Sequence, residues 1–215
     1  MTDHQSNSDA YDSPLKEVLE HAFPEFMAFY FPEAYTQIDW AQDHEFKNTE
    51  LRQVVRDAEL GKRLADTLVQ VTLKDGEPRW IYILIEVQGR RDSDFAKRMF
   101  TYNYRLFDRY ARPIASLAVL ADEDAGWRPD SYGFEVLGCC HTLEFPVVKL
   151  IDYADHAELL AANPNPFALV TAAHLRTRPD QARPPGPLSG QTRPRAFAVP
   201  TRLGQAAHTR PFRHH

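Results

Sequence analysis

The 215-residue chain lacks any long hydrophobic run and has only two cysteines, the neighbours Cys139 and Cys140. A membrane-spanning helix needs about 18 apolar residues in a row, so we expect no membrane association. Adjacent cysteines fit neither a disulfide framework nor a CxxC metal clip. We therefore expect them to be small buried residues in a reducing compartment. The polar first ten residues lack the features of a secretory signal, which favours a cytoplasmic location.

Several common catalytic motifs are also missing. The sequence contains no GxxxxGK[ST] or GxGxxG loop, which argues against standard cradles for nucleoside triphosphates or dinucleotides. It has no HExxH pattern and no Cys/His spacing typical of zinc sites, and no GxSxG nucleophile motif. The acidic run Asp122 to Asp124 precedes Gly126, and we expect it to lie in a solvated loop.

Charge is divided unevenly along the chain. Residues 176–215 hold eight of the 25 basic residues, all arginine, only one of the 30 acidic residues, and seven of the 16 prolines. This composition predicts a disordered Arg/Pro-rich tail over 176–215, attached to an acidic body. Two interpretations stay open: a genuine basic arm that binds nucleic acid electrostatically, or translation of a GC-rich gene out of frame. Residues 1–13 are expected to be disordered.

Helical and strand patterns alternate over residues 14–175, which predicts one α/β domain with a central mixed β-sheet flanked by helices. An amphipathic helix is expected from Pro14 to Tyr30, capped by Asp12 or Ser13 and kinked or split at Pro24. The other expected helices are Thr49–Ala58, Asp92–Arg109 with Asp92 or Ser93 as its cap and Phe95, Met99, Tyr102 and Leu106 buried, and Phe167–Leu175. The expected strands outside the hairpin are Ile114–Leu120, Tyr132–Leu137 and Thr142–Leu150.

A β-hairpin is predicted from residue 67 to residue 88, because two strand-like runs flank the turn-rich residues 74–78. If the turn is centred on Gly76, Asp66 lies opposite Glu86. The same register pairs Leu68 with Leu84, and Val69 with Ile83. Strand alternation then puts Asp66, Leu68, Glu86 and Gln88 on one face, and the apolar odd-numbered positions on the other, as core.

Glu86 ends an otherwise apolar run, and an unpaired buried carboxylate costs several kcal/mol. Two carboxylates with an amide nearby suit a hard cation such as Mg²⁺, with Mn²⁺ as the alternative ion. Asp66, Glu86 and Gln88 therefore form a candidate metal site. The competing interpretation pairs Asp66 with Arg63 or Lys62, and Glu86 with Arg90 or Arg98, as ordinary ion pairs.

These residues resemble the core of the PD-(D/E)XK nuclease superfamily, in which an Asp precedes a (D/E)-x-K signature on the next strand. The string IEVQGRRDSDFAKRMFTYNYRLFDRY is similar to the recombination-promoting nuclease and transposase family, where Gln commonly replaces the Lys. The segment from Tyr11 to Lys16 resembles that family's opening HDxxFK motif, with Tyr11 in place of His and Leu15 in place of Phe. The resemblance covers about residues 11–175.

The resemblance implies a restriction-endonuclease-like core and a metal-dependent DNA endonuclease of mobile-element type, acting as a homodimer. It makes Asp66 and Glu86 the metal ligands and Gln88 the group that positions the water or phosphate. An amide carries no positive charge, so another group must compensate the charge of the transition state. Arg98 is the candidate, with Tyr102 one turn further along as an accessory residue. The alternative is that Arg98 is solvated at the surface and Tyr102 packs in the core.

Basic residues near this site are candidates for DNA binding. They are Arg90, Arg91, Lys97, Arg105 and Arg109, with Arg112 close by. An ordinary charged helix surface is the alternative, because acidic residues are interspersed among them. Two other functions stay open: a non-catalytic interaction domain or decayed transposase-like fragment that keeps the fold, and a structural protein whose tail recruits acidic partners.

Overall fold

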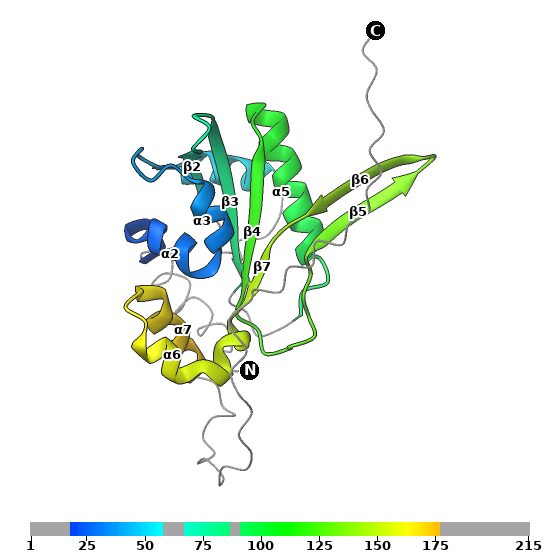
Figure 1. The fold of residues 1–215 in the computed structure, drawn as a ribbon. Coiled ribbons are helices and arrows are strands. Elements are labelled where there is room, and N and C mark those ends of the chain that lie inside the picture. Colours follow the sequence, from blue (N-terminus) through cyan, green and yellow to red (C-terminus); the bar gives the residue numbers. More distant parts are fainter. Residues whose placement is uncertain (1–17, 58–66, 87–90, 177–215) are drawn as a thin grey trace. The chain divides into compact units, whose positions relative to one another are not determined.

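The computed structural model describes residues 18–57, 67–86 and 91–176, and strand positions 80–86 by their backbone pairing. The expected disordered ends and the expected first helix cap lie outside these ranges. The chain forms a five-stranded sheet and a separate two-stranded hairpin, with helices beside the larger sheet (Figure 1). The prediction of an α/β domain with a mixed sheet is confirmed. In the described part of the chain, every helix is too short or too polar to cross a bilayer.

The helical elements follow one another along the chain. They are α2 (Phe23–Tyr30), α3 (Pro32–Gln37), α4 (Asn48–Asp57), α5 (Phe95–Tyr110), the 3-10 helix η1 (Leu150–His156), α6 (Ala157–Ala162) and α7 (Pro166–Arg176). The strands are β1 (Glu45–Phe46), β2 (Thr67–Thr72), β3 (Pro78–Glu86), β4 (Ile114–Leu120), β5 (Ser131–Val136), β6 (Cys139–Glu144) and β7 (Val147–Lys149).

The larger sheet is antiparallel at one side and parallel at the other. Its strand order is β1-β2-β3-β4-β7. Strands β1, β2 and β3 pair antiparallel, whereas β4 runs parallel to both β3 and β7. The carboxyl ends of β3, β4 and β7 therefore meet at one edge, which is also the edge where β2 begins.

Each face of this sheet carries its own hydrophobic core. On one face, Val69 of β2 and Val119 of β4 pack with α2 and with Phe167 of α7. On the other face, Leu68 and Leu120 pack with α4 and with the buried stripe of α5, which is Phe95, Met99, Tyr102 and Leu106. The stripe is as predicted, and so is the assignment of Leu68 and Val69 to opposite faces. Helices cover the face of the sheet on the α5 side as well, and Leu68 on that face is fully buried.

Most helix predictions agree with the structure. Residues 18–21 are helical and the helix is interrupted at Ala22, so Pro24 lies in the first turn of a new helix, α2. Helix α7 starts where predicted, and the Asn165 side chain accepts a hydrogen bond from the Phe167 amide at 2.9 Å. The predicted start of α5 is wrong: this helix begins at Phe95 after Asp94, which makes no capping bond with its side chain.

The predicted register of the hairpin is wrong by two residues. Leu68 pairs with Tyr82 and Val69 with Ile81, so Asp66 and Glu86 are not directly opposite in this register. The cause is a three-residue loop centred on Asp75. Its ends are joined by the Leu73 amide, which donates to Glu77 O at 3.1 Å, and Gly76 takes the left-handed conformation with φ 82°. A shift of two keeps the alternation of faces, which explains why the faces of Leu68 and Val69 were predicted correctly.

Two predictions about the region after β4 are also wrong. The expected strand Thr142–Leu150 is two strands, β6 and β7, separated by Phe145 and Pro146. Phe145 is buried in the α5-side core, and proline has no N–H for a ladder, so the chain leaves the hairpin and joins the larger sheet there. Cys139 and Cys140 are exposed, not buried, because they lie near the tip of the hairpin.

Replacement of Gly76 tests the turn that sets the register. We expect Gly76→Ala to lower the free energy of unfolding by about 1 kcal/mol, since an L-residue at positive φ is strained. A Cβ at this position meets no atom within 4 Å, so the cost is conformational only. Gly76→Asn is the matched control and should cost less, because Asn tolerates this conformation. Urea denaturation measures both, and equal losses would contradict the assignment.

Candidate functional site

Position 86 lies in the middle of the sheet at its carboxyl edge. Glu86 ends β3 and pairs with Leu120 at the end of β4, and Leu120 pairs in turn with Lys149 at the end of β7. Paired residues of parallel strands lie on the same face, so these three positions form one row on the face that α5 covers. Neighbouring strands are about 4.8 Å apart, which separates positions 86 and 149 by about 10 Å.

A buried ion pair stands at the β7 end of this row. Lys149 is fully buried and Asp122 is 2% exposed. The Lys149 ammonium donates to both carboxylate oxygens of Asp122 at 2.8 Å and to the carbonyl oxygen of Trp127 at 2.7 Å. All three N–H donors of the ammonium are therefore used. The prediction that residue 122 is solvated is wrong, whereas Glu123 and Asp124 are exposed as expected.

Aromatic rings connect this ion pair to the first turn of α5. The Lys149 ammonium lies 5.3 Å from the centre of the Trp127 ring, and this ring packs edge-on against Phe95 at 5.6 Å. The guanidinium of Arg98 lies 5.9 Å from the centre of the Phe95 ring. Lys149 and Arg98, which come from opposite sides of β4 in sequence, are thus connected by three successive contacts, two between a cation and a ring and one between two rings.

Arg98 is held in place at the start of α5. Its guanidinium forms an ion pair with Asp92, three residues before the helix begins, and only 16% of its side chain is exposed. Asp92 also accepts a hydrogen bond from the Asp94 amide at 2.9 Å, so its carboxylate is tied to the local backbone. The structure therefore places a partly buried, fixed positive charge at the sheet edge where β3 ends.

The predicted metal ligands are only partly within the described residues. Asp66, Gln88 and Arg90 lie outside them, and Glu86 is located by its backbone pairing alone. The described ladder ends with Thr67 opposite Ile83. Glu86 lies three residues beyond Ile83, the last residue of β3 that pairs with β2, and Asp66 directly precedes Thr67 in sequence. Within the described part, no three His, Cys, Asp or Glu side chains gather as a metal site.

Two of the described candidates for DNA binding, Arg91 and Arg109, already contact protein groups. Lys97 is exposed, and Arg91 is exposed but lies 3.6 Å from Asp124. Arg109 donates a hydrogen bond to the Gln53 side chain of α4 at 2.9 Å. The basic stripe of α5, with Arg105 half-buried, thus borders α4 as well as solvent.

Tyr102, the accessory candidate, is 1% exposed and belongs to the core on the α5 side of the sheet. Its ring packs in the same cluster as Phe95 and Leu106. Tyr102 therefore has the packing role that is the alternative to a functional one.

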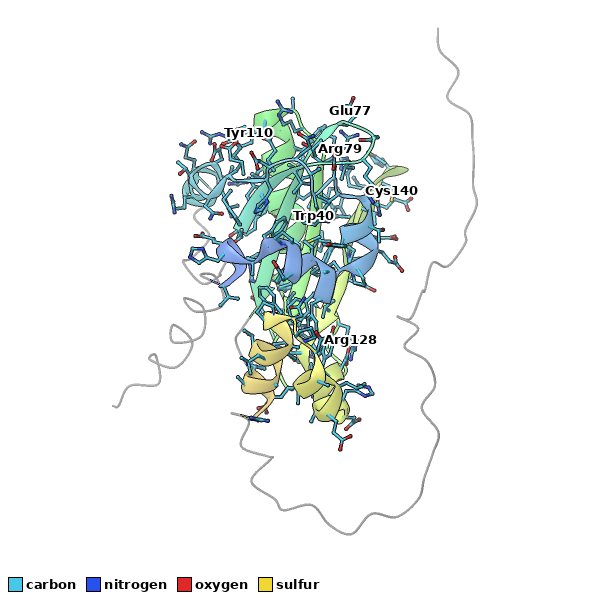
Figure 2. All side chains as sticks on the ribbon, turned by 60° about the vertical axis from the view of Figure 1, so that its left-hand side comes forward. Trp40, Glu77, Arg79, Tyr110, Arg128 and Cys140 are labelled. Carbon is cyan, nitrogen blue, oxygen red and sulfur yellow. The ribbon has the colours of Figure 1, made fainter. Side chains whose placement is uncertain are left out.

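An exposed ion pair lies beside the buried one. Arg128 donates to the two carboxylate oxygens of Asp152, at 2.8 Å for one of them, and both side chains are nearly half exposed. This hydrogen bonding raises the pKa of Arg128 above its ordinary value. Figure 2 shows Arg128 at the end of the sheet near α6, far from Glu77 and Arg79 at the opposite end. The pair of Arg128 and Asp152 therefore offers an exposed control for the buried pair.

Sequence reasoning missed Asp122, Lys149 and Trp127 as parts of this site. One signal was available: Lys149 follows the run Phe145 to Val148, as Glu86 follows its apolar strand. A charged residue at the end of an apolar strand requires a partner in both cases. Its partner could not be inferred, because three acidic residues follow β4 and only the fold selects Asp122.

Residues 10–116 match the model of a protein family described as "Putative transposase, YhgA-like". The match covers just under half of the chain, namely the part from the N-terminal region through α5 into β4. It supports a transposase-like family for this part. No curated protein and no solved structure matches the chain significantly.

The buried pair can be tested by its effect on stability. Lys149→Met leaves the Asp122 carboxylate buried without its counter-charge, although the Asp124 amide still donates to it at 2.9 Å. We expect the free energy of unfolding to fall by roughly 3–5 kcal/mol. Replacing both partners, Asp122→Leu with Lys149→Met, should cost clearly less, because no uncompensated charge remains. Arg128→Gln breaks the exposed pair and should cost less than about 1 kcal/mol. Urea denaturation gives the ranking, and a double variant less stable than Lys149→Met would contradict it.

Proposed function

We propose, from the similarity of residues 10–116 to transposase-like proteins, that this chain is a metal-dependent DNA endonuclease acting in mobile-element biology. Its catalytic site would lie at the carboxyl edge of β3, β4 and β7. Asp66 and Glu86 would hold Mg²⁺, and Gln88 would orient the attacking water or the scissile phosphate. The PD-(D/E)XK assignment belongs to this proposal.

One observation carries the proposal: the hairpin puts the start of β2 and the end of β3 at the same edge of the sheet. The ladder between β2 and β3 ends with Thr67 opposite Ile83. If the same register continued, Asp66 and Glu86 would be diagonal neighbours on the two strands. Diagonal neighbours across two strands lie about 7–8 Å apart. Two carboxylates and an amide in such an arrangement are the oxygen donors that Mg²⁺ prefers.

The chemistry of the proposed reaction follows from these groups. Mg²⁺ held by the two carboxylates would polarise the phosphate and lower the pKa of an attacking water. Gln88 supplies hydrogen bonds but no charge, so the negative charge that develops on the phosphate needs a cation from elsewhere in the chain. Arg98 is suited to this role, because its position is fixed by Asp92 before any substrate binds.

Access of DNA to this edge depends on local charge, since the body of the chain is acidic overall. Lys97 and Arg91, with Arg90, Arg105 and Arg109, would contact phosphates near the start and along the side of α5. Neutralising phosphates releases counterions, so binding should weaken steeply as salt rises. A homodimer would present two such sites to the two strands of a duplex.

Cleavage of supercoiled plasmid in the presence of Mg²⁺ tests the proposal. We expect the full chain to cleave, and EDTA to abolish cleavage. Asp66→Asn and Glu86→Gln should each lower the rate by more than about 100-fold, since even the outer partners of metal ligands cost 10–100-fold. Glu77→Gln is the matched control: it removes an exposed carboxylate at the other end of the same hairpin.

The variants also separate a wrong function from a wrong site. A folded wild-type chain that does not cleave would favour a non-catalytic or decayed protein. Cleavage that persists in Asp66→Asn and Glu86→Gln, or that falls equally in Glu77→Gln, would show that these carboxylates are not the metal ligands.

A further inference from the structure

We propose that Lys149 and Asp122 are positioning residues for Arg98, and that they act through Trp127 and Phe95. This inference rests on the proposed nuclease function, in which Arg98 compensates charge on the phosphate. It assigns a role to a buried charge pair that the metal site itself does not use.

The first step of the argument is that Lys149 cannot act directly. Its three N–H donors are all used by Asp122 and by the Trp127 carbonyl oxygen, at 2.7–2.8 Å. The side chain is fully buried, so no phosphate oxygen can reach it without breaking these bonds. Any effect on a reaction at position 86 must therefore pass through the residues that the pair holds.

The second step concerns the part of the chain that this pair holds in place. Lys149 ends β7, and Asp122 stands two residues after the end of β4, so their contact joins the ends of two strands. The bond to the Trp127 carbonyl closes the segment from 122 to 127 over the sheet edge. Trp127 is 7% exposed, and this closure leaves its ring between the ammonium of Lys149 and the ring of Phe95.

The third step connects this segment to Arg98. Phe95 is fully buried in the first turn of α5, and its ring lies under the guanidinium of Arg98. Asp92 holds that guanidinium by an ion pair, and the Phe95 ring contacts it at 5.9 Å from the ring centre. If the Trp127 ring moves, Phe95 loses its edge contact and Arg98 loses the support below it.

A contribution to the stability of the protein would not by itself explain why this buried pair is charged. Taking two charges out of water is costly, and apolar residues of similar volume often serve equally well for stability. A purely structural pair should be replaceable by Leu and Met without a specific effect on Arg98. A positioning pair should not be, because the carbonyl of Trp127 then loses its donor.

The test is a mutant cycle in the full chain, with Mg²⁺-dependent plasmid cleavage as the assay. The apolar double variant Asp122→Leu with Lys149→Met should lower kcat by about tenfold, because small displacements of a positioned group cost rates of this order or more. The Mg²⁺ concentration for half-maximal rate should stay within about twofold, since the metal ligands are not touched. Arg128→Gln breaks the exposed pair with Asp152 directly after this segment, and it should leave both quantities unchanged.

The cycle is completed in an Arg98→Gln background. If the pair acts through Arg98, the double variant should lower kcat there by less than about twofold, because the effects of coupled residues do not add. The same tenfold loss in both backgrounds would overturn the proposal. So would a rise in the Mg²⁺ requirement, or an apolar variant that cleaves like the wild type.

A second readout does not depend on cleavage. The NMR signal of the Arg98 Nε–Hε group should shift in the apolar double variant and stay in place in Arg128→Gln. An unmoved signal in a chain that cleaves would overturn the positioning role and leave the nuclease intact. A wild-type chain that does not cleave would overturn both the nuclease and the role that rests on it.

Discussion

The parallel pairing of β3 with β4, buried between two helical layers, is the interaction on which the rest of the structure depends. Two neighbouring parallel strands require a crossover that returns the chain to the opposite end of the sheet. Helix α5 makes this crossover, so it must begin at the carboxyl edge where β3 ends. Arg98 and position 86 are therefore brought to the same edge by the topology, although no local sequence pattern indicates this.

The short strand β7 extends this arrangement by one strand. Its ladder with β4 covers only three residue pairs, which by itself is a weak attachment. The Lys149 side chain adds three charge-assisted hydrogen bonds across the same junction. Its ammonium also lies over the Trp127 ring, which packs against Phe95, and Phe95 packs in turn against Phe145. The edge that carries the proposed site is thus built from one ladder, one buried ion pair and one aromatic cluster.

Much of the fold could be predicted because apolar periodicity is local information. The stripe from Phe95 to Leu106 has helical spacing, and the alternation through Leu68 and Val69 has strand spacing. The register of the hairpin could not be predicted in this way. A slip of two residues leaves every side chain on the same face, so the hydrophobic pattern is equally satisfied by either register. The conformation of Gly76 and the length of its loop made the choice.

The sequence by itself determined most of the longer helices and strands, the buried stripe of α5 and the similarity to a transposase-like family. It also marked Glu86 as a charge at the end of an apolar strand. Only the tertiary structure decided that Asp122, and neither of the two acids that follow it, is buried against Lys149, 27 residues away. It likewise decided that the cysteines of the hairpin are exposed. The reason is physical: periodicity depends on neighbours along the chain, whereas burial and ion pairing depend on neighbours in space.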